Sequence, residues 1–249
     1  MKPGFLPGLS RRLARAIPFR PHRWRLAQPV VSFSFDDFPA SAARHGASLL
    51  EAHGARGTFY FADALAGGTE NAQPIVTPAE VAALAARGHE IGGHTHGHAD
   101  VQQVSPAFLH AEITANNAAI AALAGRAPRS FAYPFGIVSL AAKHRLARHY
   151  AGLRGIQPGI NRGWIDLAHL RAEELYDQSL TPLRLHTLLD DLARRGGWLI
   201  FYTHDVRNDP SAIGCSPLFM AMVLEQVRRR GLPIQTIAAV LAAMGTERA

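Results

Sequence analysis

The chain has 249 residues, of which 48% are hydrophobic and 18% charged. This length and composition suit one large globular domain, and no apolar run reaches the roughly 18 residues that a membrane span requires. The single cysteine, Cys215, excludes an internal disulfide. The formal net charge is +7, but seven basic residues precede the first acid, Asp36, and the remainder is formally neutral. That balance argues against a nucleic-acid-binding domain surface.

Residues 1–28 form a basic leader in this prediction, and residues 29–249 form a single domain. One helical face of the leader is apolar, and the opposite face carries arginines; the apolar residues are Leu6, Leu9, Leu13 and Ile17. Such a helix could lie on an anionic membrane, pack on the domain or belong to a partly disordered arm. No continuous apolar segment follows the arginines, so there is no clear signal peptide. We expect a cytoplasmic protein, with peripheral membrane contact through the leader as the open alternative.

From Pro29 onward, short apolar runs alternate with helical patterns. Strands are expected at 30–35, 57–61, the residues leading into Gly92-Gly93, 131–133, 198–202 and 232–236. Helices are expected at 42–53, from Thr77 to Gly88, at 106–123, around 185–192, around 220–227 and from the last strand to about 244. This alternation predicts an α/β fold with a mainly parallel sheet. In such folds the reactive groups gather at the carboxyl ends of the strands.

Three polar groups follow predicted strands. The pair Asp36-Asp37 follows the first strand, and adjacent carboxylates on an extended backbone point in different directions. His94 and His98 are four residues apart, so their imidazoles can converge on one metal ion if the chain turns there. His204 ends the apolar run at 198–202. Two histidines and a carboxylate can hold a divalent metal, with a base and an acid left over for hydrolysis.

The combined pattern resembles the NodB-type polysaccharide deacetylases, which form carbohydrate esterase family 4. The segments that carry the resemblance occur in the family's order and span about residues 29 to 240: Ser34-Phe35-Asp36-Asp37, His94-Thr95-His96-Gly97-His98, Phe131-Ala132-Tyr133-Pro134-Phe135-Gly136 and Tyr202-Thr203-His204. The resemblance implies a distorted (β/α) barrel with fewer than eight repeats.

The resemblance also implies roles for individual residues. Asp36 would be the general base and His204 the general acid, while a divalent metal, most commonly Zn²⁺ in this family, would be held by Asp37, His94 and His98. The backbone N–H of Phe135 would help to bind the oxyanion, and Tyr133 and Trp164 are further candidates for the oxyanion and substrate site.

The chain departs from the family pattern at three points. Phe38 stands where the first motif usually ends in glycine, which we expect to narrow the space beside the base. Ala132 stands where many members carry an arginine that steadies the catalytic aspartate, and Arg171 is the candidate to replace that arginine. The fourth motif is not recognisable, so the residue that orients His204 is open between Asp177 and Asp205.

The predicted function is metal-dependent removal of an N-acetyl, or similar acyl, group from an amino sugar in a polysaccharide, an oligosaccharide or its precursor. One alternative is a deformylase or another hydrolase of non-peptide C–N bonds on the same fold. The other is an inactive carbohydrate-binding protein, which the loss of the motif arginine and of the fourth motif would explain. The sequence names neither the sugar nor the oligomeric state.

Overall fold

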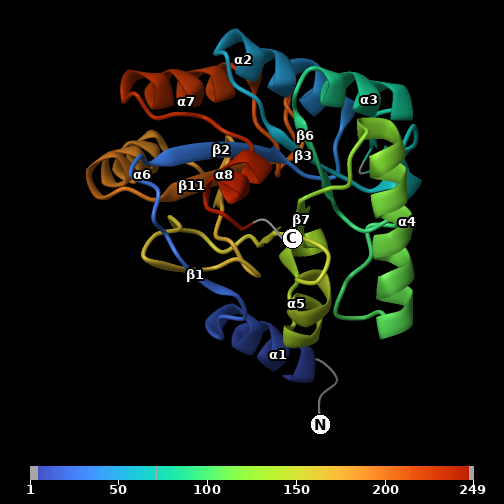
Figure 1. Ribbon diagram of the computed structural model, residues 1–249. Coiled ribbons are helices and arrows are strands. Elements are labelled where there is room, and N and C mark those ends of the chain that lie inside the picture. The colour runs from blue at the N-terminus through green and yellow to red at the C-terminus, as the bar shows by residue number, and fades with distance from the viewer. Residues whose placement is uncertain (1–4, 71, 247–249) are drawn as a thin grey trace.

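The computed structural model describes residues 5–70 and 72–246 and is built around a curled sheet of seven parallel strands (Figure 1). The strands lie in the order β10 (Glu173–Glu174), β11 (Trp198–Thr203), β2 (Val30–Phe35), β3 (Thr58–Phe61), β6 (Glu90–Gly93), β7 (Ser130–Ala132) and β8 (Gly152–Arg154). Every residue of β2 and β11 is buried, as expected for central strands covered on both faces. These two strands pair along their full length, from Val30 opposite Trp198 to Phe35 opposite Thr203.

The sheet curls into a half-barrel, which confirms the predicted distorted barrel. The segment after β8 returns toward the other edge of the sheet, where Arg154 bridges Leu170 and the backbone N–H of Gly155 donates to Leu170 O. Leu170 then leads into β10 at the opposite end of the strand order. The carboxyl ends of β2, β6, β7 and β11 are thereby turned toward a common centre.

Helices cover the outside of the half-barrel (Figure 1). They are α2 (Ala47–Ala52), which continues a π-helical turn at Ala42–Gly46, α3 (Pro78–Ala86), α4 (Pro106–Ala124), α5 (Leu140–Leu146), α6 (Pro182–Arg195) and α7 (Pro217–Arg229). The last helix, α8 (Ile237–Ala243), packs on the other face of the sheet, where its apolar residues contact the cluster that contains Val30 and Trp198. The predicted start of α3 is confirmed, because Thr77 and Glu80 form a reciprocal capping box. The predicted end of α4 is also confirmed, with Gly125 in the left-handed region at φ 69°.

The N-terminal segment contacts the rest of the molecule. Its helix α1 (Phe5–Ala16) lies beside α5 and buries Ala14 completely (Figure 1). The short strand β1 (Pro21–Arg23) then pairs antiparallel with β9 (Trp164–Asp166). Lys143, buried on α5, donates to Ile17 O and forms an ion pair with Asp166. Among the described residues, no helix has the length and hydropathy needed to cross a bilayer.

Some elements differ from the prediction. The strand expected at 232–236 is reduced to a single bridge between Ile234 and Val31, because Thr236 already caps α8. The short strands β8 and β10 were not predicted, since each offers too few residues to show a period. The hairpin of β4 (Thr69–Glu70) and β5 (Gln73–Pro74) and the single-turn helices Asp63–Leu65 and Pro134–Gly136 were missed for the same reason.

Phe38 lies in the core, so the expectation that it narrows the space beside Asp36 is wrong. Its side chain is fully buried against Phe59 and Phe61, with ring centroids at 4.8 and 6.2 Å. Its φ is 58°, a left-handed conformation in which glycine is favoured over any L residue. That requirement accounts for the glycine that usually ends this motif, and aromatic packing offsets the strain here.

Replacing Phe38 by alanine is expected to lower the free energy of unfolding by about 3–5 kcal/mol, because the ring is lost from a packed core while the strained backbone remains. Phe38→Gly should be less destabilising than Phe38→Ala by roughly 1 kcal/mol, because glycine removes the left-handed strain. Denaturant unfolding of both variants checks this pair of effects. Equal losses would show that the backbone of residue 38 is unstrained.

Candidate active site

The predicted motif residues meet in one pocket of about 380 Å³ at the carboxyl ends of the strands. Asp36 and Asp37 follow β2, His94 follows β6, and His204 follows β11. The backbone N–H of Asp36 donates to Thr203 O at 2.9 Å, which ties the first motif to the last. The full lining consists of Asp36, Asp37, Glu70, His94, His98, Phe135, Gly136, Ile156, Tyr176, Tyr202, His204 and Ile213.

Asp37, His94 and His98 form a compact cluster suited to a divalent metal. All three are buried, and their candidate ligand atoms lie within 4.8 Å of one another. Asp37 Oδ1 is 3.2 Å from His94 Nε2 and 3.1 Å from His98 Nε2. Burial alone would raise the pKa of Asp37, but its contacts with the two imidazoles lower that pKa on balance. The carboxylate is therefore ionised, as a metal ligand must be.

The far side of each imidazole fixes which nitrogen faces the cluster. His94 Nδ1 lies 2.8 Å from Ala132 O, and because a carbonyl only accepts, Nδ1 must carry the proton. His98 Nδ1 lies 3.4 Å from Glu70 Oε1. Nε2 of each ring therefore faces Asp37, and once a metal ion displaces the protons from these nitrogens the cluster offers two nitrogens and one oxygen. This donor set fits a zinc site with open positions for water and substrate.

Asp36 is held by a residue that the sequence analysis missed. Its Oδ1 accepts a hydrogen bond from Arg154 Nη2, and both side chains are almost fully buried. The Arg154 guanidinium also lies between two aromatic rings, at 5.2 Å from the Tyr60 centroid and 5.0 Å from the Tyr202 centroid. Although burial would lower the pKa of Arg154, Asp36 and the tyrosines raise it on balance, so the residue is a fixed positive charge.

Arg171 does not take this position, and the hypothesis that it replaces the motif arginine is wrong. Its exposed guanidinium donates to Pro158 O at 2.9 Å, and its backbone pairs with the side chain of Asn161. Arg154 can reach Asp36 because it lies directly opposite Ala132 in the β7–β8 pair. The arginine absent from position 132 is therefore supplied by the neighbouring strand.

His204 is oriented by a backbone carbonyl. Its Nδ1 lies 3.1 Å from Ile213 O, so this nitrogen donates and Nε2 faces the pocket, 3.7 Å from Asp37 Oδ2. Asp177, a candidate for this role, instead accepts from the backbone of Ser216, and Asp205 accepts from Ser211. Both carboxylates act indirectly, because they fix the loop that presents the Ile213 carbonyl.

Three other candidates have different positions. The Phe135 side chain is 60% exposed at the pocket, with its ring centroid 4.4 Å from that of His98. Tyr133 is buried, and its hydroxyl donates to Ala168 O at 3.0 Å, so its side chain packs in the core with Phe131 rather than lining the pocket. Trp164 is 74% exposed on β9 and lines a different pocket.

Strained backbone is concentrated in the motifs. Among the described residues other than glycine, positive φ occurs at Asp37, Phe38, Thr95, His98 and Phe135, all in motif segments, and at Ala72. Each such residue costs on the order of 1–3 kcal/mol and persists only where the surroundings enforce it. Because these residues cluster in the motif segments, we infer that the fold tolerates backbone strain there in order to hold the side chains in place.

The sequence profile of the polysaccharide deacetylase family matches residues 25–155, more than half of the chain. The chain belongs to the polysaccharide deacetylase family. A chitin deacetylase from Pestalotiopsis sp. is 27% identical over 106 residues, which cover 43% of this chain and 34% of that protein. The chain thus matches about a third of the length of this curated relative.

Solved structures share the deacetylase fold. A family 4 acetyl xylan esterase from Clostridium thermocellum, in complex with a cobalt ion, is 21% identical with a TM-score of 0.60, and the match covers 87% of this chain and 92% of that chain. The Bc1960 peptidoglycan N-acetylglucosamine deacetylase is 16% identical with a TM-score of 0.59, over 86% of this chain and 89% of that chain. At these identities the likeness establishes the fold.

Glu70 is a second pocket residue that sequence reasoning missed. It comes from the β4–β5 hairpin, and its Oε1 lies 3.4 Å from His98 Nδ1. Its other oxygen, Oε2, is buried without a hydrogen-bond partner among the described residues. A carboxylate behind a metal-binding histidine fixes the ring and increases its basicity. Glu70 is therefore placed to orient His98 toward the cluster without itself joining it.

Replacing Glu70 by glutamine is expected to weaken zinc binding by about 10- to 100-fold, the range typical of residues that orient metal ligands. Competition with a chromophoric chelator measures the affinity. Glu225→Gln is the matched control, because Glu225 pairs with arginines on the exposed face of α7. An unchanged zinc affinity in Glu70→Gln would show that His98 is oriented without this carboxylate.

Proposed function

We propose that the protein is a metal-dependent hydrolase that removes an N-acetyl group from an amino sugar in a polysaccharide, an oligosaccharide or its precursor. The observation that carries this proposal is the convergence of Asp36, the Asp37-His94-His98 cluster and His204 in one pocket. Family membership supports deacetylation, and the donor set supports a divalent metal. A base, an acid and a metal cluster in one pocket are the parts that hydrolysis of an unactivated amide requires.

Asp37, His94 and His98 would hold the metal, most commonly Zn²⁺ in this family. A divalent ion there lowers the pKa of water and polarises the acyl carbonyl. The protein's own contribution is to fix the three ligand atoms: Ala132 O orients His94, and Glu70 orients His98. Ionisation of Asp37 before metal entry removes the need to displace a proton from that ligand.

Asp36 is assigned the role of general base. Arg154 occupies one side of its carboxylate and keeps the group in place, while the residue lines the pocket beside the metal ligands. The carboxylate takes a proton from the attacking water as the new C–O bond forms. We assign the backbone N–H of Phe135 to the developing oxyanion, as the resemblance implies, because Phe135 follows β7 at the pocket.

His204 is assigned the role of general acid. Its Nδ1–H is committed to Ile213 O, so proton transfer takes place at Nε2, the nitrogen on the pocket side. The departing nitrogen of the amide must be protonated when the C–N bond breaks, because an amide anion is too basic to leave. The imidazolium donates that proton, which leaves an amine on the sugar and acetate as products.

Release of acetate from N-acetylated oligosaccharides and precursors tests the proposal. The zinc-loaded protein is compared with chelated protein and with Asp37→Ala, and zinc stoichiometry is measured on each. We expect release only from the loaded wild type. Release of formate from N-formyl substrates instead would favour a deformylase. Zinc binding with saturable sugar binding but no release from any substrate would favour a binding protein, and absence of bound zinc would overturn the ligand set.

A further inference from the structure

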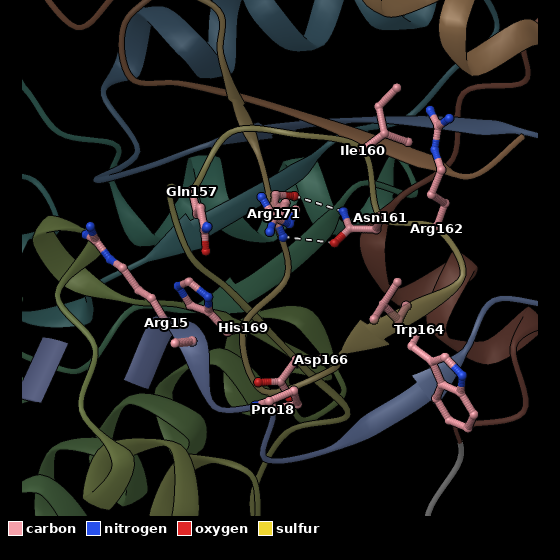
Figure 2. Close-up of a pocket in the computed structure, with 12 residues that line it drawn as sticks. Arg15, Pro18, Gln157, Ile160, Asn161, Arg162, Trp164, Asp166, His169 and Arg171 are labelled. Atoms are coloured by element: carbon pink, nitrogen blue, oxygen red, sulfur yellow. Dashed lines mark hydrogen bonds between the residues drawn. The ribbon is translucent and has the colours of Figure 1, made fainter. Parts of the chain in front are cut away.

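A second pocket, of about 180 Å³, lies apart from the active-site pocket and shares no lining residue with it. It is bounded by the end of α1, by β9 and by the segment 157–171 that closes the half-barrel (Figure 2). Gln157, His169 and Arg15 lie to one side of Arg171, and Asn161 and Trp164 lie to the other. Nothing in the proposed deacetylation requires this pocket.

His169 is a largely buried histidine on the wall of this pocket. It is 6% exposed, and its Nε2, which has no hydrogen-bond partner among the residues that the structure describes, packs against Gly155. Burial, followed by the positive charges around it, lowers the pKa of His169 to about 4, so the ring is neutral at pH 7 and has one N–H to donate.

The surrounding charge is positive. Arg15, at the end of α1, and Arg171, beside Asn161, are both exposed arginines that line the pocket, and both contribute to lowering the pKa of His169. Among the described residues, neither arginine forms an ion pair with an acid in the lining. Asp166, the acid in the lining, is neutralised by Lys143, and the third lining arginine, Arg162, pairs with Asp191 at 2.6 Å. The pocket therefore attracts anions.

We propose that this pocket is a second binding site that takes a phosphate group, with Arg15 and Arg171 as its charged donors and His169 as a neutral donor. Guanidinium groups present paired N–H donors that match phosphate oxygens. His169 and the side-chain amide of Gln157 extend the donor set inward (Figure 2). The 74% exposed indole of Trp164 at the rim offers a flat apolar surface for whatever bears the phosphate.

The proposal assigns a binding role to the N-terminal helix. Arg15 is the last-turn basic residue of α1, and the helix is held in place by its contacts with α5 and by the bond from Lys143 to Ile17 O. Arg12 lies on the same helix, is also exposed and does not line the pocket. Arg12 therefore provides a control with the same charge in the same helix.

Calorimetric titration of inorganic phosphate into the full chain tests the site. We expect saturable binding that Arg15→Gln and Arg171→Gln each weaken about tenfold or more, the loss typical of a charge-assisted hydrogen bond. Arg12→Gln should weaken it less than about twofold, and His169→Phe should weaken it while thermal unfolding shows an intact fold. If Arg12→Gln weakened phosphate binding as much as Arg15→Gln and Arg171→Gln do, binding would depend on the general positive charge of the surface, and the proposal would be overturned. Absence of saturable phosphate binding would also overturn it.

Two further experiments show where the anion binds and whether a lipid or a soluble molecule carries the phosphate. Binding that Asp37→Ala abolishes and Arg171→Gln leaves unchanged would place the anion at the metal cluster and overturn the proposal. Vesicles of phosphatidylcholine with and without phosphatidylglycerol test a lipid headgroup: selective loss of vesicle binding in Arg15→Gln and Arg171→Gln assigns the site to membrane phosphate. Vesicle binding that these variants leave unchanged, together with their loss of phosphate binding, assigns it to a soluble phosphorylated ligand.

Discussion

Replacing Arg154 by methionine is expected to lower the free energy of unfolding by about 3–5 kcal/mol, because it leaves the Asp36 carboxylate buried without its cation. Arg154 is fully buried and Asp36 is 4% exposed, so water cannot readily solvate the Asp36 carboxylate once the guanidinium is removed. The same change should lower the rate of acetate release by about 100-fold, the effect of displacing a reacting group by roughly 1 Å. Denaturant unfolding and initial rates measure the two effects separately.

A double-mutant cycle isolates the pair. Asp36→Asn removes the charge that Arg154 neutralises, so the double variant should be destabilised less than the sum of the single variants, by about 1–3 kcal/mol. Arg171→Met is the matched control, since Arg171 is exposed, and we expect a change within about 0.5 kcal/mol. If Arg154→Met were no more destabilising than Arg171→Met, the buried pair would not hold Asp36.

The difference between Arg154 and Arg171 shows what a single sequence can reveal. Asp36 and His204 were placed correctly because each follows a long apolar run, and His94 because the histidine spacing of its motif follows a short predicted strand; parallel strands bring such positions to one edge. Arg154 ends a strand of three residues, which is too short for a periodic signal. Its contact with Asp36 depends on the β7–β8 register, and register is set by tertiary packing rather than by local pattern.

The partner of His204 was missed for a different reason. Sequence reasoning searches for side chains of the right type, and it offered Asp177 and Asp205 as carboxylates near the histidine. The observed acceptor is the backbone carbonyl of Ile213, which any residue type would supply. The one sign of this loop in the sequence is Gly214, which has no space for a Cβ because the Asp205 carboxylate packs directly against it. Close approach of that kind becomes visible only when the loop is folded.

Replacing His204 by glutamine is expected to lower kcat/KM for N-acetylated oligosaccharides by about 10²–10⁴-fold, the usual contribution of a positioned general acid. The reason is the leaving group, since the sugar nitrogen departs only when it is protonated. An aryl acetate releases a phenolate that leaves without protonation, so its hydrolysis should fall by less than about tenfold in the same variant. Acetate release from the two substrates, measured on one enzyme preparation, gives the comparison.

Asp36→Asn supplies the matched control, because the attacking water must lose a proton whichever group departs. That variant should lose activity on the amide and on the aryl ester alike. The two variants therefore differ in pattern as well as in size: His204→Gln separates the substrates, and Asp36→Asn does not. Equal loss on both substrates in His204→Gln would mean that His204 acts on the attack step or on the metal cluster, where its Nε2 lies 3.7 Å from Asp37 Oδ2.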